Sequence, residues 1–224
     1  MTEKTVYTAI FGNYQDPKTG ITTPYDDLKT PTIVTPGWRY ICYTDQILTD
    51  PVWEIKQIDL TMEPQRMARY IKLMFHKFVY SEYSLWLDAS FQININLELF
   101  WARCFKSPFT APAHPIRNCV YREVASCIAN RRGDEVEIFN QGEEYKRLKV
   151  PAFNGIITSG VLMRQKTEGC IKMCEEWWEE LSNYSARDQI AFANISRGWK
   201  FNTFKWDYSQ SRELKYIKHF KHRH

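Results

Sequence analysis

Residues 83–90 place side chains capable of chemistry directly after a strand-like run: apolar Trp86 and Leu87 are followed by Asp88 and then Ser90. A buried strand that ends in an acid is how open α/β sheets present a ligand-binding carboxylate. An Asp-x-Asp pair at such a place binds a divalent ion and, through it, a diphosphate, because hard cations prefer oxygen ligands. Ser90 keeps an oxygen but removes one charge. We therefore expect a diphosphate anchor at Asp88 and Ser90 and leave its dependence on Mn²⁺ or Mg²⁺ open.

A second polar cluster occupies residues 114–123. His114 precedes a proline, and Arg117 and Glu123 fall at the start and in the second turn of an expected helix. Polar groups of several types converge there, as recognition of a hydroxyl-rich substrate requires. The alternative is a helix cap with a structural ion pair, and the residues alone favour neither.

Small residues mark a third segment. Asn154, Gly155 and Gly160 would let the backbone approach a ligand closely. Their spacing matches neither a phosphate-binding loop nor a dinucleotide fingerprint, so the sequence supports neither an ATPase nor a Rossmann oxidoreductase.

The run Arg187-Asp188-Gln189 puts an acid in the first turn of an expected helix. One interpretation makes Asp188 a base or a stabiliser beside a reacting carbon. The other makes it a carboxylate that pairs with the helix dipole, which is a common surface feature.

Three basic residues, Arg66, Arg69 and Lys72, are spaced three apart in a helix expected over residues 64–79, so they share one face. Spacing alone favours a solvated stripe over a ligand contact. The opposite face is apolar and is expected to pack inward.

The net charge of +4 is concentrated in a basic C-terminal tail, residues 207–224, and the rest of the chain is nearly balanced. General nucleic-acid binding is therefore not expected, whereas peripheral contact with an anionic membrane is a candidate role for the tail. His219, His222 and His224 lie in this tail. Most such histidines are solvated, but His219 is a tentative metal ligand that folds back towards Asp88.

The elements that must position these residues alternate along the chain. Strands are expected over 5–11, 40–43, 53–58, 83–88, 156–164 and 201–206, and helices over 64–79, 97–105, 118–130, 167–181 and from Ser185, which is expected to cap the last one. Residues 17–36 are expected to be irregular and 133–144 turn-rich. This order predicts an α/β fold, with a mixed central sheet flanked by helices, in a single domain over residues 1–224.

The chain has 224 residues, and no export signal or membrane span is evident in them, so we expect a cytoplasmic protein that is at most peripheral to a membrane. Its six cysteines show no metal-binding pairs and are expected to be buried, reduced thiols.

Taken in order, these segments resemble one known family. The ordered set comprises residues 7–14 (YTAIFGNY), 42–45 (CYTD), 69–72 (RYIK), 85–90 (LWLDAS), His114-Pro115 with Arg117, Cys119, Tyr121 and Glu123, and 187–189 (RDQ). It is similar to the glycosyltransferase-like family formerly listed as a domain of unknown function and, more broadly, to GT-A nucleotide-sugar transferases.

The resemblance implies roles that spacing could not supply. Asp188 becomes the catalytic acid, which activates an acceptor hydroxyl in inverting enzymes or stabilises the donor in retaining ones. Asp88 and Ser90 take the Asp-x-Asp position. The nucleotide and donor contacts become Ala9, Phe11, Tyr14, Asp45, Arg66, Arg69, Lys72, Asp88 and Ser90, and the donor and acceptor cleft becomes His114, Arg117, Glu123, Asn154, Gly155, Gly160, Arg187 and Gln189.

The resemblance implies a transferase that moves a sugar from a UDP- or GDP-linked donor to a hydroxyl acceptor on a glycan, polysaccharide or glycolipid. Two alternatives remain open. One is a metal-assisted hydrolase that uses Asp88 and the C-terminal histidines. The other is a non-catalytic carbohydrate-binding domain that has kept the fold.

Overall fold

The computed structural model describes residues 3–15, 19–205 and 217–220. Its main sheet has seven strands in the order β10-β8-β9-β6-β1-β4-β5. β9 runs antiparallel to β6 and β8, and the other neighbours are parallel, so the expected mixed sheet is confirmed. The strands are β1 (Lys4–Ile10), β4 (Trp38–Thr44), β5 (Glu54–Gln57), β6 (Tyr83–Leu87), β8 (Phe109–Pro112), β9 (Val161–Gln165) and β10 (Asn202–Phe204).

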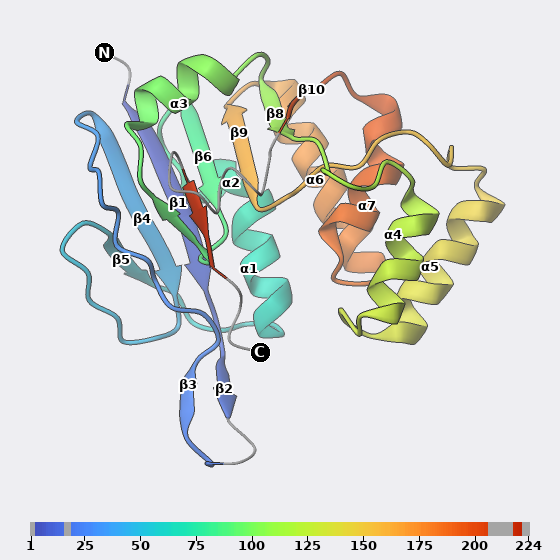
Figure 1. The fold of residues 1–224 in the computed structure, drawn as a ribbon, viewed down its shortest axis with the longest axis horizontal. Coiled ribbons are helices and arrows are strands. Elements are labelled where there is room, and N and C mark those ends of the chain that lie inside the picture. The colour runs from blue at the N-terminus through green and yellow to red at the C-terminus, as the bar shows by residue number, and fades with distance from the viewer. Residues whose placement is uncertain (1–2, 16–18, 206–216, 221–224) are drawn as a thin grey trace.

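Two small antiparallel pairs flank this sheet. β2 (Asn13–Gln15) and β3 (Thr22–Pro24) form a hairpin that projects from the end of β1 (Figure 1). This hairpin places a strand in residues 17–36, where irregular chain was expected. β7 (Phe91–Ile93) pairs with β11 (Ile217–His219), which brings the C-terminal part of the chain back to the end of β6.

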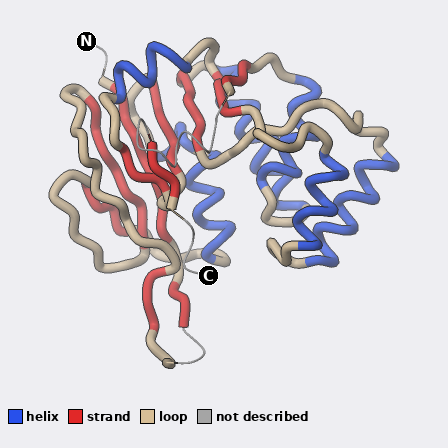
Figure 2. The backbone as a smooth tube through the Cα atoms, viewed as in Figure 1, coloured by secondary structure: helices blue, strands red, loops and turns tan. Residues whose placement is uncertain are grey.

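Helices cover both faces of the sheet and extend beyond one side of it (Figure 2). One face packs against the helices α1, α2, α6 and α7, and the other against α3 and the β7–β11 pair. A third core joins α4, α5 and α7. The helices are α1 (Pro64–Leu73), α2 (Phe75–Phe78), α3 (Leu97–Cys104), α4 (Val120–Ala129), α5 (Glu135–Arg147), α6 (Glu168–Asn183), α7 (Asp188–Ile195) and the 3₁₀ turn η1 (Ser196–Gly198).

Three helix predictions need correction. The helix expected over 64–79 is two helices, because Met74 leaves the helical conformation with φ −82° and ψ 37°. The stretch expected to be turn-rich forms α5, since the Asp134 side chain accepts hydrogen bonds from the backbone N–H of Val136 and Glu137. Ser185 does not cap α7. Its hydroxyl donates to Gln141 Oε1 at 2.6 Å, and α7 begins only at Asp188.

The prediction for the thiols is confirmed, because all six cysteines are buried and free. Within residues 3–15, 19–205 and 217–220, no helix is long and apolar enough to cross a membrane.

Candidate functional site

The parallel strands β1, β4 and β6 end at the same edge of the sheet, so the residues that follow them gather there. Gly12 follows β1 with φ +76°, and a Cβ atom at this position would lie 2.7 Å from Pro64, so only glycine fits between β1 and α1. The Gly12 N–H donates to Asp45 Oδ1 at 3.1 Å and to Oδ2 at 3.2 Å. Asp45, expected to meet the base or ribose, thus fixes the backbone at Gly12, where the chain leaves β1.

Asp88 follows β6 and remains partly open to solvent, with 37% of its side chain exposed. Its Oδ1 accepts from Trp86 Nε1 at 2.7 Å and from Lys72 Nζ at 3.4 Å. Trp86 can donate to Asp88 because residues two apart in an extended strand share a face. Gly160 lies directly beside this carboxylate: a Cβ there would sit 3.1 Å from Asp88 Oδ2 and 2.8 Å from the Phe91 ring. Because residue 160 has no side chain, the space beside Oδ2 stays open.

Lys72 is the buried cation of the site, with 2% of its side chain exposed. Its Nζ lies 2.6 Å from Asp188 Oδ2 and 5.5 Å from the centre of the Trp86 ring. One ammonium group therefore connects the two carboxylates Asp88 and Asp188. A solvated stripe, which spacing alone favoured, is wrong for Lys72.

Asp188 is the first residue of α7, and 4% of its side chain is exposed. Its Oδ1 accepts from the backbone N–H of Gln189 at 3.0 Å, and Arg69 Nε lies 3.9 Å from Oδ2. Burial alone would raise the pKa of Asp188, but the charges of Lys72, Arg69 and Arg187 and the hydrogen bond from Lys72 hold the pKa well below its usual range. The carboxylate is therefore ionised and firmly paired.

A layer below the site fixes the backbone of Lys72. Its carbonyl accepts from the Tyr7 hydroxyl at 2.9 Å and from Arg164 Nη1 at 2.6 Å. Arg164 is fully buried, also donates to the Tyr7 hydroxyl, and lies 4.5 Å from the centre of the Phe75 ring. Sequence reasoning missed Tyr7, Trp86 and Arg164. Trp86 could have been found from its place two residues before Asp88, whereas nothing in the sequence connects Arg164 with residue 72.

The C-terminal strand β11 lies beside the Asp88–Ser90 turn. His219 is opposite Phe91 in the β7–β11 pair with their rings 5.0 Å apart, and the Phe220 N–H donates to the Ser90 carbonyl at 2.8 Å. The expected return of His219 towards Asp88 is therefore seen in the backbone pairing. His222 and His224 lie outside the described residues.

Few metal-ligand side chains of the described chain surround the Asp88–Ser90 turn. Among the described residues, no three His, Cys, Asp or Glu side chains gather closely enough to hold an ion. The ammonium of Lys72 already lies against Asp88 Oδ1, and Ser90 supplies no charge. These residues alone do not complete a divalent-metal site, and metal dependence stays a prediction.

The other two basic residues of α1 have different surroundings. Arg66 donates to the carbonyls of Leu181 and Tyr184, each at 2.8 Å, so it ties α1 to the end of α6. Arg69 Nε is buried and makes no hydrogen bond within the described chain. Of the three basic residues, Lys72 and Arg69 reach Asp188, while Arg66 lies one turn away.

The His114 cluster is a separate centre. Glu123 is fully buried, and its Oε2 accepts from Arg117 Nε at 2.5 Å, while Cys127 Sγ donates to Oε1 at 3.4 Å. His114 Nδ1 accepts from the Arg117 N–H at 2.9 Å. Burial, and after it the charge of Arg117, lowers the pKa of His114. This geometry contains the ion pair of the structural interpretation but not its helix cap, because α4 begins at Val120 with no side-chain hydrogen bond at its cap. A role in substrate recognition stays a prediction.

One backbone segment links the two centres. The Ile156 carbonyl accepts from the His114 N–H at 2.7 Å, and the neighbouring Ile157 carbonyl accepts from Gln189 Nε2 at 3.0 Å. Gln189 therefore stands between Asp188 and the His114 cluster.

The remaining predicted contacts are spread over the fold. Ala9 and Phe11 are buried in the core under α1, and Tyr14 lies on the β2–β3 hairpin. Asn154 is exposed, and its Nδ2 donates to Ser196 Oγ at 3.4 Å. Gly155 has φ +82° at an exposed turn. The hydrogen bond that the Asn154 side chain makes goes to Ser196, so it does not connect this residue with Asp88.

A comparison with protein families supplies the context for this geometry. The model of the TOD1/MUCI70 glycosyltransferase-like domain matches residues 49–222, a span that includes Lys72, Asp88 and Asp188. No curated protein matches the chain. The family match covers most of the chain, from residue 49 onwards, and is consistent with the resemblance to a glycosyltransferase-like family. The chain belongs to the TOD1/MUCI70 glycosyltransferase-like domain family.

Proposed function

We propose that this chain is a glycosyltransferase of the GT-A class that moves a sugar from a UDP- or GDP-linked donor to a hydroxyl group. Acceptors of this kind are found on glycans, polysaccharides and glycolipids, so polysaccharide biosynthesis is the expected setting. The observation that carries the proposal is the ammonium of Lys72, held between Asp188 at 2.6 Å and the partly exposed Asp88 at 3.4 Å.

The reaction needs positive charge beside its leaving group. The bond between the anomeric carbon and a diphosphate oxygen breaks, a bond forms from that carbon to the acceptor hydroxyl oxygen, and the hydroxyl proton passes to the departing nucleoside diphosphate, on which negative charge develops. Lys72 and Arg69 would stabilise that charge, because preorganised cations in a buried site cost no reorganisation when the charge develops. Arg164, whose guanidinium donates to the Lys72 carbonyl, adds a further fixed charge beneath.

Asp188 keeps its proposed place as the catalytic carboxylate, and its surroundings favour one of its two expected roles. A general base works best when its pKa lies near the operating pH. Burial raises the pKa of Asp188, but the charges of Lys72, Arg69 and Arg187 outweigh burial and hold the pKa well below its usual range. We therefore favour the role in which Asp188 orients Lys72 and stabilises positive charge on the donor sugar. The role in which Asp188 accepts a proton is less favoured.

Asp88 is proposed to contact the donor through Oδ2, because Oδ1 already accepts from Trp86 and Lys72. Carboxylate oxygens of this kind accept hydrogen bonds from ribose or sugar hydroxyls. Ser90 and His219 border the same turn. The tail beyond them is proposed to contact an anionic membrane peripherally, in a cytoplasmic protein, although most of its basic residues lie outside the described chain.

A donor screen tests the proposal. The protein is incubated with UDP- and GDP-linked sugars, with and without Mn²⁺ and a mixture of hydroxyl acceptors, and released nucleoside diphosphate is measured. Release that increases with an acceptor and disappears in Asp88→Asn supports a transferase. Release of free sugar that no acceptor increases would favour the hydrolase. Binding of sugars with no nucleotide binding would favour the carbohydrate-binding domain.

A further inference from the structure

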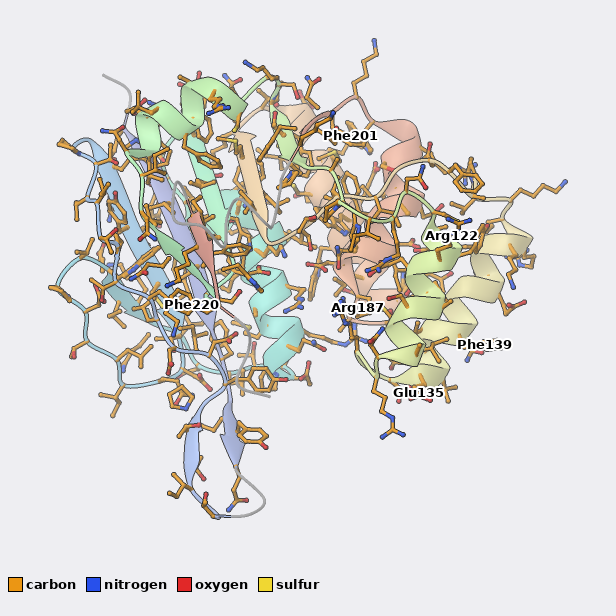
Figure 3. All side chains as sticks on the ribbon, in the orientation of Figure 1. Arg122, Glu135, Phe139, Arg187, Phe201 and Phe220 are labelled. Carbon is orange, nitrogen blue, oxygen red and sulfur yellow. The ribbon has the colours of Figure 1, made fainter. Side chains whose placement is uncertain are left out.

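Two lysines flank the aromatic ring of Phe220, directly beside the Asp88–Ser90 turn. Lys29 Nζ lies 5.0 Å from the centre of this ring, and Lys218 Nζ lies 4.7 Å from it. The backbone places the ring, because the Phe220 N–H donates to the Ser90 carbonyl at 2.8 Å. In the view of Figure 3, Phe220 lies towards the end of the sheet where β1 and β4 end. Two ammonium groups are therefore held next to the proposed donor contacts.

The backbone that carries each lysine is fixed to its neighbours. Lys218 belongs to β11 and lies opposite Gln92 of β7. The Lys29 carbonyl accepts from Trp53 Nε1 at 3.1 Å, and the next carbonyl, that of Thr30, accepts from Gln92 Nε2 at 2.9 Å. β7 therefore holds both segments, although they are far apart in the sequence. A ligand that meets both lysines has less chain to order on binding.

The lysine pair carries more positive charge than its surroundings neutralise. Asp27 Oδ2 lies 3.2 Å from Lys29 Nζ. Within residues 3–15, 19–205 and 217–220, no acid lies within ion-pair distance of Lys218. Two ammonium groups beside one ring repel each other, and the ring attracts each cation without neutralising it. This arrangement favours an anionic ligand.

The same charges disfavour a divalent cation at the Asp88–Ser90 turn. Asp88 Oδ1 already accepts from Lys72 Nζ at 3.4 Å, and Ser90 supplies no second carboxylate. A metal ion at Asp88 would have to compete with the Lys72 ammonium, and it would also meet the positive potential of Lys29 and Lys218. The charged groups that border this turn therefore suit a diphosphate better than a metal ion.

We propose that Lys29 and Lys218 bind the diphosphate of the nucleotide-sugar donor and stabilise the charge that develops on it, so that the reaction needs no divalent metal. This inference rests on the proposed transferase function and deepens it, because it assigns the counter-charge of the leaving group. Ammonium groups donate charge-assisted hydrogen bonds to phosphate oxygens. Phe220 is a positioning residue that holds both ammonium groups beside Ser90. The pair would act together with Lys72 on the leaving group.

Calorimetric titration of the full chain with UDP, GDP and inorganic pyrophosphate, in EDTA and again in Mn²⁺, tests the inference. The nucleotide that the wild type prefers should bind equally in both solutions. Lys29→Met and Lys218→Met should each weaken the binding of this nucleotide and of pyrophosphate about tenfold, because a hydrogen bond from a charged donor is lost. Phe220→Leu should weaken both a few-fold, and Phe220→Tyr should bind like the wild type. The matched controls Lys172→Met and Lys200→Met, at exposed positions, should change nothing.

Nucleotide binding that requires Mn²⁺, or that both lysine variants leave unchanged, overturns the inference and leaves the transferase proposal standing. Pyrophosphate binding that depends on the two lysines, with no nucleotide bound, keeps the lysine site and removes the transferase. A wild type that binds neither pyrophosphate nor nucleotide contradicts both.

Two further measurements complete the test. Thermal-unfolding curves identify any lysine variant that has failed to fold, and the comparison of Phe220→Leu with Phe220→Tyr then decides. Sedimentation with phosphatidylglycerol vesicles separates a donor diphosphate from a lipid phosphate. If Lys29→Met and Lys218→Met weaken only the binding to vesicles, the pair belongs to the membrane contact and the inference is wrong.

Discussion

The Lys72 centre and the His114 cluster both hold a buried acid against a basic residue, yet they differ in how completely their groups are used. Glu123 is fully buried, and each of its oxygens accepts a hydrogen bond, from Arg117 or from Cys127. Lys72 is shared by two carboxylates, and one of them, Asp88, keeps 37% of its side chain exposed. A centre that is complete in itself stabilises the fold, whereas one with an open carboxylate can receive a ligand.

The largest effect is expected at Lys72. Lys72→Met leaves Asp188 buried without its main partner, so the free energy of unfolding should fall by about 3–5 kcal/mol. Chemical denaturation measures this, with Lys77→Met on α2 as an exposed control. The double variant Lys72→Met/Asp188→Asn should recover part of the loss. A single variant as stable as the wild type would show that Lys72 and Asp188 are not paired.

Glu123→Gln should have a smaller effect of a different kind. The ion pair with Arg117 becomes a hydrogen bond from the charged guanidinium to a neutral amide oxygen, so stability should fall by about 1.5–3 kcal/mol. Binding of nucleoside diphosphates should not change, because Glu123 has no contact with Asp88 or Lys72 in the described structure. A large loss of nucleotide binding in a folded variant would mean that the His114 cluster is part of the donor site.

The smallest effect is a pH dependence at His114. Its pKa is lowered in the folded state, by burial first, so the unfolded chain binds more protons as pH falls through the ordinary histidine value of about 6.5. Acidification from pH 7 to 5 should therefore destabilise the wild type more than His114→Asn. Denaturation curves at several pH values measure the difference in slope. Equal slopes would mean that His114 is not held neutral.

The edge of the sheet could be predicted because its signals are local. An apolar run that ends in Asp88 indicates a buried strand and an acid at its end, and the structure agrees. The signal for the start of α5 was also local, since Asp134 precedes Glu137 by three residues as in a capping box. The acidic composition of residues 133–144 nevertheless led to the prediction of turns.

The face that a helix buries could not be predicted in the same way. Spacing shows that Arg66, Arg69 and Lys72 share a face, but the packing of α6 and α7 decides that this face looks inward. Arg164 was missed for a related reason. Its partner Lys72 is 92 residues away in the sequence, and only the antiparallel register of β9 brings the two together.

Calorimetric titration of UDP and GDP into the wild type, Lys72→Met/Asp188→Asn and Glu123→Gln tests the central claim most directly. The double variant removes the charge of Lys72 together with that of Asp188, so Asp188 is not left buried without its partner. Its stability can therefore be compared with that of Glu123→Gln. The account predicts that a nucleoside diphosphate binds the wild type and Glu123→Gln alike and is lost in the double variant. Equal binding to all three proteins, or none to the wild type, would contradict it.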